Sequence, residues 1–298
     1  MDLVDIEISD EQIETFRQDG FIIVDRIISD RAVEQLRERY DALFKGEWET
    51  GLVPDEVNWK EGRDDPSLTR QICNAWKSDR YVAQIILNPK IGRACARLGS
   101  WPGTRISQDN VLWKAPGGKP LGFHQDSSYE KWTKIPDWVS CWIALDDTTA
   151  HGGTVEYVRG SHKWSEYGMI EQFHAPDNEI KDLSKAAEAA GVEEPERVPV
   201  VVKAGGGAFH QGWTWHGSGK NNSENARRSI VAHCMSSENE FHPTEVGYIY
   251  SRYKRFGDPK MDETHFPILW QEDGYCSDFI EPFGNREINW GEAVPESK

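Results

Sequence analysis

Cysteine is scarce in this sequence, and long apolar runs are missing. The 298 residues include five cysteines, an odd number with no CxxC pair, which argues against a disulfide framework and against a zinc ribbon. No run of 18 apolar residues occurs, so we expect no transmembrane helix. Residues 1–5 are acidic and lack the basic and apolar pattern of a signal peptide. We therefore expect a cytoplasmic protein.

Positive charge is also in short supply. The chain has 34 Lys and Arg against 50 Asp and Glu, a net charge of −16. Nucleic acid and anionic membranes would be repelled, so we expect neither as a partner. The mean hydropathy of −0.68 is ordinary for a globular chain. We expect one domain over 1–298; the sequence assigns no oligomeric state.

Helical patterns dominate residues 1–100. Ser9 and Gln12 form a capping-box pattern, and Gly20 and Gly46 stand where helices would end. The predicted elements are helices from Ser9 to about Gln18, from Ser29 to Gly46 and over 79–98 with a break near Asn88-Pro89, a strand over 21–24, and a loop over 47–67.

Short strands dominate from residue 104 onward. Segments rich in β-branched and aromatic residues alternate with Gly and Pro turns, which is typical of a sandwich or jelly roll. We predict a jelly-roll core over 104–236 and a C-terminal extension over 237–298, whose tail from Glu281 is rich in charge. The expected strands are 106–114, 139–145, 154–159, 198–203 and 229–235.

The polar stretch 171–197 interrupts this series of strands. It contains a helix-prone segment over 183–190. We interpret it as an insertion between strands, either a lid over a site or a plain surface excursion.

The segment Gly122-Phe123-His124-Gln125-Asp126 carries the sharpest local signal. In a strand, residues two apart point to the same face, so His124 and Asp126 can reach one metal ion. Two histidines and one carboxylate on one face of the metal form the facial triad of non-haem Fe(II) oxygenases. The pair alone is a weak signal, because a second histidine must come from elsewhere in the chain.

A second signal is Trp215-His216-Gly217-Ser218-Gly219, followed by Arg227 and Ser229. Arg227 lies far enough after His216 for a turn and a return strand, and its guanidinium suits the distal carboxylate of a dicarboxylic co-substrate. His210 is the alternative ligand, but the Gly-Ser-Gly context favours His216, and we expect His210 to be buried beside the site. We expect surface or core positions for the remaining histidines His151, His174, His233, His242 and His265.

Together these segments resemble the phytanoyl-CoA dioxygenase family, a branch of the 2-oxoglutarate-dependent oxygenases. The resemblance covers most of the chain and includes Asp10-Glu11-Gln12, Asp19-Gly20-Phe21, Val111-Leu112-Trp113-Lys114-Ala115-Pro116-Gly117, His124-Gln125-Asp126, Trp142-Ile143-Ala144-Leu145-Asp146-Asp147, Gly160-Ser161-His162, His216-Gly217-Ser218-Gly219 and Arg227-Arg228. It implies a mainly β fold with flanking helices, a double-stranded β-helix of the jelly-roll, cupin-like kind.

The resemblance also implies roles for individual residues. The iron ligands would be His124, Asp126 and His216, and Arg227 would bind the distal carboxylate of 2-oxoglutarate. Further residues would line the co-substrate pocket or assist Arg227: Ser229, Ser218, Trp142, Asn110 and, as a weaker candidate, Gln108.

The implied cofactors are Fe(II), 2-oxoglutarate as co-substrate, and O2. The implied reaction oxidises a C–H bond of a small organic substrate, a natural-product intermediate among the candidates, and releases succinate and CO2. Asp126 favours hydroxylation over halogenation, because the related halogenases lack this carboxylate. Tyr129 and one or two of the nearby tryptophans would line the substrate pocket. The negative charge argues against a CoA thioester, although Arg252, Lys254 and Arg255 form a local basic patch.

Two other functions fit the same pattern. The chain could be a jelly-roll binding protein without catalysis, or a metal enzyme that does not use 2-oxoglutarate. Arg227 separates the latter from an oxygenase, since a metal enzyme without a dicarboxylic co-substrate has no need of it.

Overall fold

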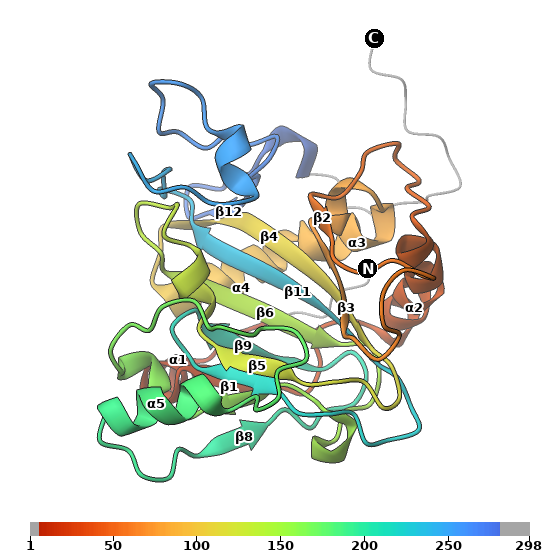
Figure 1. Ribbon diagram of the computed structural model, residues 1–298. Coiled ribbons are helices and arrows are strands. Elements are labelled where there is room, and N and C mark those ends of the chain that lie inside the picture. The colour runs from red at the N-terminus through yellow and green to blue at the C-terminus, as the bar shows by residue number, and fades with distance from the viewer. Residues whose placement is uncertain (1–5, 281–298) are drawn as a thin grey trace.

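The N-terminal helices agree with the sequence pattern. The computed structural model describes residues 6–280 (Figure 1), and its helices there are α1 (Asp10–Asp19), α2 (Asp30–Lys45), α3 (Arg80–Ile86) and α4 (Pro89–Gly99). Ser9 and Gln12 form the capping box of α1, and the side chains of Ser29, Asp79 and Asn88 cap the other three. The predicted break near Asn88-Pro89 is therefore confirmed as the start of α4.

Two antiparallel sheets form the body of the molecule. The larger sheet has the order β1-β9-β6-β11-β4-β3-β2, with β12 also paired to β4, and the smaller has the order β5-β10-β7-β8. The strands are β1 (Phe21–Val24), β2 (Glu56–Val57), β3 (Arg70–Cys73), β4 (Gly103–Lys114), β5 (Leu121–His124), β6 (Trp138–Ala144), β7 (Glu156–Val158), β8 (Arg197–Pro199), β9 (Gly207–Gln211), β10 (His216–Ser218), β11 (Arg227–Ser236) and β12 (Ile268–Gln271). This is the predicted double-stranded β-helix.

The remaining helical elements lie in the connections. They are α5 (Lys181–Ala189) and the 3-10 turns η1 (Ala75–Lys77), η2 (Asp126–Tyr129), η3 (Ala150–Gly152), η4 (Ser161–Lys163), η5 (Tyr250–Tyr253) and η6 (Asp278–Ile280).

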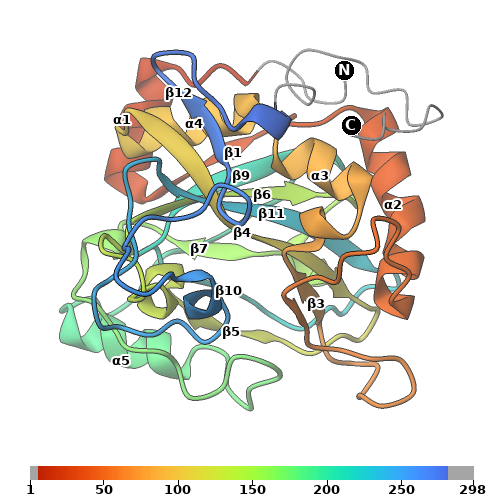
Figure 2. The same cartoon turned by 90° about the horizontal axis from the view of Figure 1, so that it is seen from above.

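The two faces of the larger sheet have different environments, because side chains alternate along each strand. One face packs its apolar side chains against the N-terminal helices, and α4 lies directly on β4, β6 and β11 (Figure 1). The core there includes Leu36, Tyr40, Ile91, Val111, Ile143, Phe209 and Ile230. The opposite face carries polar residues and faces the smaller sheet across a cavity. Figure 2 shows β5, β7 and β10 on that side of β4, β6 and β11.

Several strands differ from the sequence prediction. The expected strands 154–159 and 198–203 are shorter, because β7 and β8 cover only 156–158 and 197–199. The strands β2, β3, β5, β9, β10 and β12 were not among the predicted segments. Most have two to five residues, too few for an alternating pattern to stand out. Pairing with a neighbour defines them, rather than their own sequence.

The helix predicted over 183–190 is confirmed as α5. Its Leu183 and Ala186 pack against Phe123 and Trp215, so α5 covers the outer side of the smaller sheet (Figure 1). The domain boundaries and the tail from Glu281 stay predictions, since 1–5 and 281–298 lie outside the described residues. Within 6–280, no helix has the length and apolarity to cross a bilayer, and the five cysteines form no disulfide.

Candidate active site

His124 and His216 face each other on adjacent strands of the smaller sheet. They are paired in the register of β5 and β10, and their ring centroids are 4.2 Å apart. Gly217 makes the close approach possible, because a Cβ at this position would lie 2.6 Å from the Phe123 ring. Two histidines that are distant in sequence therefore share one buried location.

Each ring is held by a backbone carbonyl. Nδ1–H of His124 donates to the Gly122 carbonyl, and Nδ1–H of His216 donates to the Thr214 carbonyl, each at 2.9 Å. These bonds leave Nε2 of both rings as the lone-pair nitrogen, the form that a metal ligand requires. Burial, together with nearby His124, also lowers the pKa of His216 well below its ordinary value, which keeps that ring neutral.

Asp126 completes the cluster in a way that partly corrects the sequence prediction. The paired strand β5 ends at His124, and Asp126 begins η2. Gln125 between them keeps an extended backbone, so His124 and Asp126 do point the same way. Asp126 Oδ1 lies 3.3 Å from Nε2 of His124 and 3.5 Å from Nε2 of His216. One ligand atom from each of these three residues lies within 4.8 Å of the others.

The other oxygen of Asp126 is held by the larger sheet. Oδ2 accepts hydrogen bonds from Nε2 of His210 at 3.0 Å and from Oγ of Ser140 at 3.2 Å. Tyr157 donates its hydroxyl to Nδ1 of His210 at 3.0 Å, which fixes that ring with its proton on Nε2. His210 is therefore buried beside the ligands, as predicted, and its second nitrogen is already used.

A second chain of hydrogen bonds reaches Asp126 through Ser140. Asn110 Nδ2 donates to Nε2 of His233 at 2.9 Å, and Nδ1–H of His233 donates to Ser140 Oγ at 2.7 Å. Ser140 pairs with His210 on one side and with His233 on the other in the strand register. Burial alone would raise the pKa of Asp126, but the surrounding histidines, His216 and His233 foremost, and the bond from His210 hold it well below its ordinary value. The carboxylate is ionised.

Arg227 lies at the first position of β11 and is 4% exposed. Its Nη1 donates to Ser229 Oγ at 3.0 Å, and its Nε has no hydrogen-bond partner. No carboxylate among residues 6–280 pairs with this guanidinium. Burial lowers its pKa to about 10, so it is still a cation at neutral pH. A buried cation without an anion is costly, which indicates that the site receives a carboxylate from a ligand.

Comparison with known proteins identifies the family. The family profile "Phytanoyl-CoA dioxygenase (PhyH)" matches residues 16–229. This chain belongs to the phytanoyl-CoA dioxygenase family. It is an Fe(II)- and 2-oxoglutarate-dependent dioxygenase.

Relatives and solved structures cover most of this family member. Ectoine dioxygenase of Bordetella bronchiseptica is 24% identical, over 80% of this chain and 79% of its own. The non-heme alpha ketoglutarate dependent carbocyclase SnoK from nogalamycin biosynthesis superimposes with a TM-score of 0.66 at 24% identity, over 88% of this chain and 96% of its own. The epimerase SnoN in complex with Fe3+, alpha ketoglutarate and nogalamycin RO superimposes with a TM-score of 0.65 at 20% identity, over 87% of this chain and 98% of its own.

The other residues expected at the co-substrate pocket of this dioxygenase lie in or beside one cavity of about 580 Å³. Ser218, Trp142, Asn110 and Gln108 line it. Ser229 does not; it is fully buried and supports Arg227 instead. Lys114 was not among the predicted site residues, but its buried Nζ donates to Ser218 Oγ and to the Gly219 carbonyl, each at 2.6 Å.

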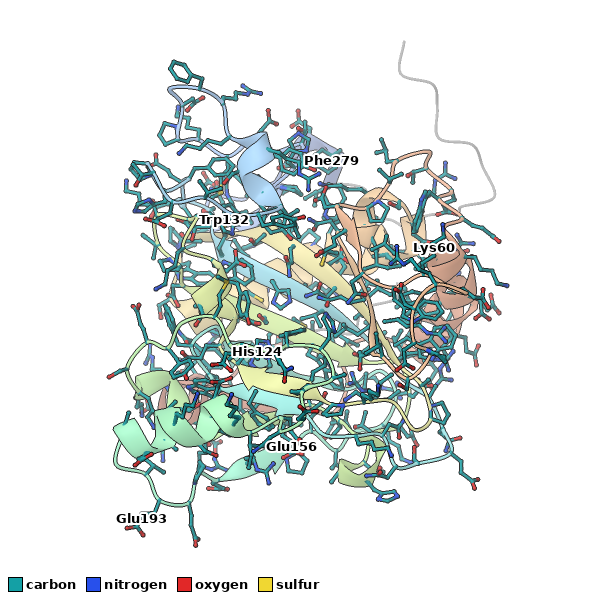
Figure 3. The ribbon with its side chains drawn as sticks, in the orientation of Figure 1. Lys60, His124, Trp132, Glu156, Glu193 and Phe279 are labelled. Carbon is teal, nitrogen blue, oxygen red and sulfur yellow. The ribbon has the colours of Figure 1, made fainter. Side chains whose placement is uncertain are left out.

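Two histidines assigned to surface or core positions also line the cavity, His174 and His233. His233 lies on β11 in alternation with Arg227, Ser229 and Val231, so the face that it shares with Arg227 was the available signal. Tyr129 lines the cavity as expected, with Trp132 and Trp138. Figure 3 shows His124 in the interior and Trp132 nearer the C-terminal segment.

Proposed function

We propose that His124, Asp126 and His216 hold Fe(II), and that Arg227 binds the distal carboxylate of 2-oxoglutarate. On this proposal the enzyme hydroxylates a C–H bond of a small organic substrate in the cavity. The observation that carries it is the buried Arg227, a cation without an acidic partner in residues 6–280, on the same cavity as three ligand atoms suited to iron.

The protein's contribution is to place and shield the reacting groups. When bound, iron with 2-oxoglutarate and O2 supplies the oxidant for the C–H bond and yields succinate and CO2. The bonds from His210 and Ser140 leave Oδ1 of Asp126 for the metal. Lys114 holds Ser218 in place beside the co-substrate. Because the two histidine rings are buried and fixed by carbonyls, the ligand geometry is formed before the metal arrives.

The basic patch gives little support to a CoA thioester as substrate. Arg255 pairs with Asp262, Arg252 donates to the Ile249 carbonyl, and Lys254 donates to two carbonyls. These cations are committed locally rather than directed at the cavity. We therefore favour a small organic substrate without phosphate groups.

We further propose that the start of the 171–197 insertion acts as a lid. The Phe173 ring stands edge-on to His124 with centroids 4.7 Å apart, and His174 bridges to Leu121 of β5. The rest of the insertion has another role, since α5 packs on the outer side of the smaller sheet, and Glu193 lies far from His124 (Figure 3).

A reducing cytoplasm suits the five unpaired thiols.

Anaerobic titration of the protein with Fe(II) and 2-oxoglutarate tests the proposed site. We expect the weak visible charge-transfer band of an iron–2-oxoglutarate complex in the wild type, loss of the band in His216→Ala, and its retention in His151→Ala, which removes an exposed histidine. Absence of the band in the wild type, with metal and co-substrate confirmed in the sample, would refute the proposed site.

A further inference from the structure

Besides the exposed Glu245, the outer part of the cavity carries two carboxyl groups that the chemistry at the iron does not use. Glu56 is the first residue of β2, and Glu130 follows η2. Both line the same cavity as the iron ligands. They come from distant parts of the chain, so their presence in one cavity is a property of the fold and not of a local acidic run.

Neither carboxyl group is neutralised by the protein. Glu56 accepts only a long contact from the Cys73 thiol, at 3.7 Å. Glu130 is 4% exposed, and its Oε2 has no hydrogen-bond partner. No lysine or arginine among residues 6–280 forms an ion pair with either group. A buried carboxyl group without a cation beside it is costly to ionise, so these groups favour a cationic partner that the cavity receives.

The cations on the cavity wall are too far away or already committed. Arg227 stands at the co-substrate end beside Ser218 and is reserved for a carboxylate. Lys131 lies at the rim with its side chain 52% exposed, and its Nζ is 3.8 Å from Glu166. Neither Arg227 nor Lys131 therefore forms an ion pair with Glu56 or Glu130.

Aromatic rings surround these carboxyl groups. Trp132 and Tyr250 pack with their ring centroids 4.9 Å apart and both line the cavity, and the exposed Tyr248 stands at its mouth. Aromatic faces attract organic cations and also bury apolar surface. The combination of unpaired carboxyl groups with aromatic faces matches a ligand that is cationic at one point and apolar elsewhere.

We propose that the outer cavity binds a protonated amine of the substrate, with its nitrogen beside Glu56 and Glu130 and its apolar body against Trp132, Tyr129 and Tyr250. The substrate class is thus an organic amine of one to a few rings that fits in about 580 Å³ together with the co-substrate. This assignment rests on the proposed function, because it takes the iron end as the site of reaction. It excludes a polyanionic thioester.

The protonation of Glu130 gives the proposal a second signature. Burial raises the pKa of Glu130 well above its ordinary value, so the empty cavity holds this group as a neutral acid. A nearby ammonium group stabilises the ionised form. Binding of an amine therefore releases a proton from Glu130, whereas binding of a neutral isostere does not.

Isothermal titration calorimetry with three matched probes tests the assignment: tryptamine, its alcohol analogue tryptophol, and indole-3-propionate. The protein carries Fe(II) and 2-oxoglutarate without oxygen. We expect tryptamine to bind about tenfold more tightly than tryptophol, and the acid to bind most weakly. Repeating the titration in buffers of different ionisation enthalpy should show proton release with tryptamine alone.

Three variants locate the effect. Glu56→Gln and Glu130→Gln keep the side-chain shape, and each should reduce the preference for the amine to about threefold or less, with proton release lost in Glu130→Gln. Glu238→Gln removes one exposed charge from the end of β11, outside the cavity, and should keep the full preference.

Several results would overturn the assignment. They are equal or tighter binding of the alcohol or the acid, an amine preference that survives both cavity variants, or no binding of any probe. The calorimetry does not depend on the charge-transfer band. If the protein prefers the amine but shows no charge-transfer band, the iron site is refuted and the cation site stands. If it shows the band but no preference for the amine, the cation site is refuted and the iron site stands.

Discussion

The two ends of the cavity are built from different kinds of structure. At the iron end, His124 and His216 stand opposite each other on paired strands, and carbonyls or neighbouring side chains fix each polar group. At the outer end, Glu56, Glu130 and the segment 245–250 come from a two-residue strand, a turn and a loop. Their carboxyl groups have almost no partners in the protein.

This contrast separates reaction from recognition. Strand register places His124 and His216, two of the proposed iron ligands, within narrow limits, so this end of the cavity is preorganised before any ligand binds. Loops at a cavity mouth can change without disturbing the sheets, so they are suited to selecting the substrate. The division predicts that substitutions at the iron end change metal and co-substrate binding, while those at the outer end change which substrate is accepted.

The largest effect is expected from Arg227→Ala. Loss of the buried guanidinium should raise the KM for 2-oxoglutarate by about 100-fold or more, because a buried charge-assisted pair is lost. Arg227→Lys keeps the charge but not the fork and should recover part of the affinity. Initial rates of succinate formation across 2-oxoglutarate concentrations measure the change.

Arg228 supplies the matched control for this substitution. It is the next residue on β11 but points to the opposite face, where it pairs with Asp146 at 2.7 Å. Arg228→Ala should lower the melting temperature and leave the KM for 2-oxoglutarate unaltered. An unchanged KM in Arg227→Ala would favour a metal enzyme that does not use 2-oxoglutarate.

His210→Ala tests whether the larger sheet positions the iron ligand Asp126. Without the bond from Nε2 to Oδ2, the carboxylate can rotate, and affinity for Fe(II) should fall by about 10- to 100-fold. Tyr157→Phe removes only the hydroxyl bonded to His210 and should cost about threefold. Competition against a chelator measures both. A drop in melting temperature with unchanged metal affinity would reduce His210 to a packing role.

The iron end could be predicted from sequence, because metal chemistry dictates its residue types. His124-Gln125-Asp126 requires only local extended backbone, and His216 with Arg227 marks a strand, a turn and a return strand. The hydrogen bond between Ser140 and His233 could not be foreseen. These two residues meet through the register of β6 and β11, which local sequence does not specify.

The outer end was not predictable from sequence. Glu56 lies in a stretch that the sequence presents as a loop, and β2 has only two residues. Its place on the cavity wall depends on β3 pairing with both β2 and β4. No periodicity within either segment carries that information, so the carboxyl pair becomes visible only in the folded chain.

Phe173→Ala tests whether the proposed lid at the start of 171–197 shields the iron end from water. Removing the ring beside His124 admits water to the iron end, so succinate formation without substrate should rise by about three- to tenfold. The KM for 2-oxoglutarate should change little. Phe256→Ala, which removes a fully exposed ring outside the cavity, is the control. Equal rates in both variants would assign 171–197 to the surface.

The smallest effect on turnover is expected from Asp109→Asn. Asp109 lies behind the outer end of the cavity, on the other face of β4. Its carboxylate accepts backbone N–H bonds from Ala75 and Trp76, and the neighbouring Asn74 donates to Asp55, next to Glu56. Burial raises the pKa of Asp109 from 3.8 to about 7. Asp109 thus lies under the segment that presents Glu56, on the face of β4 opposite the cavity.

The raised pKa of Asp109 makes stability depend on pH with a definite sign. Between about pH 4 and 7 the folded chain keeps a proton that the unfolded chain has lost, so the contribution of Asp109 to the free energy of unfolding falls as pH rises through that window. Asn at position 109 cannot titrate, so the free energy of unfolding of Asp109→Asn should not contain this pH dependence. Measured by urea unfolding, it should rise relative to that of the wild type by about 1–4 kcal/mol between about pH 4 and pH 8. Asp147→Asn is the control of opposite sign, because a bond from Lys203 lowers the pKa of that exposed carboxyl. Parallel curves for Asp109→Asn and wild type would mean that Asp109 is already ionised in the fold across this range.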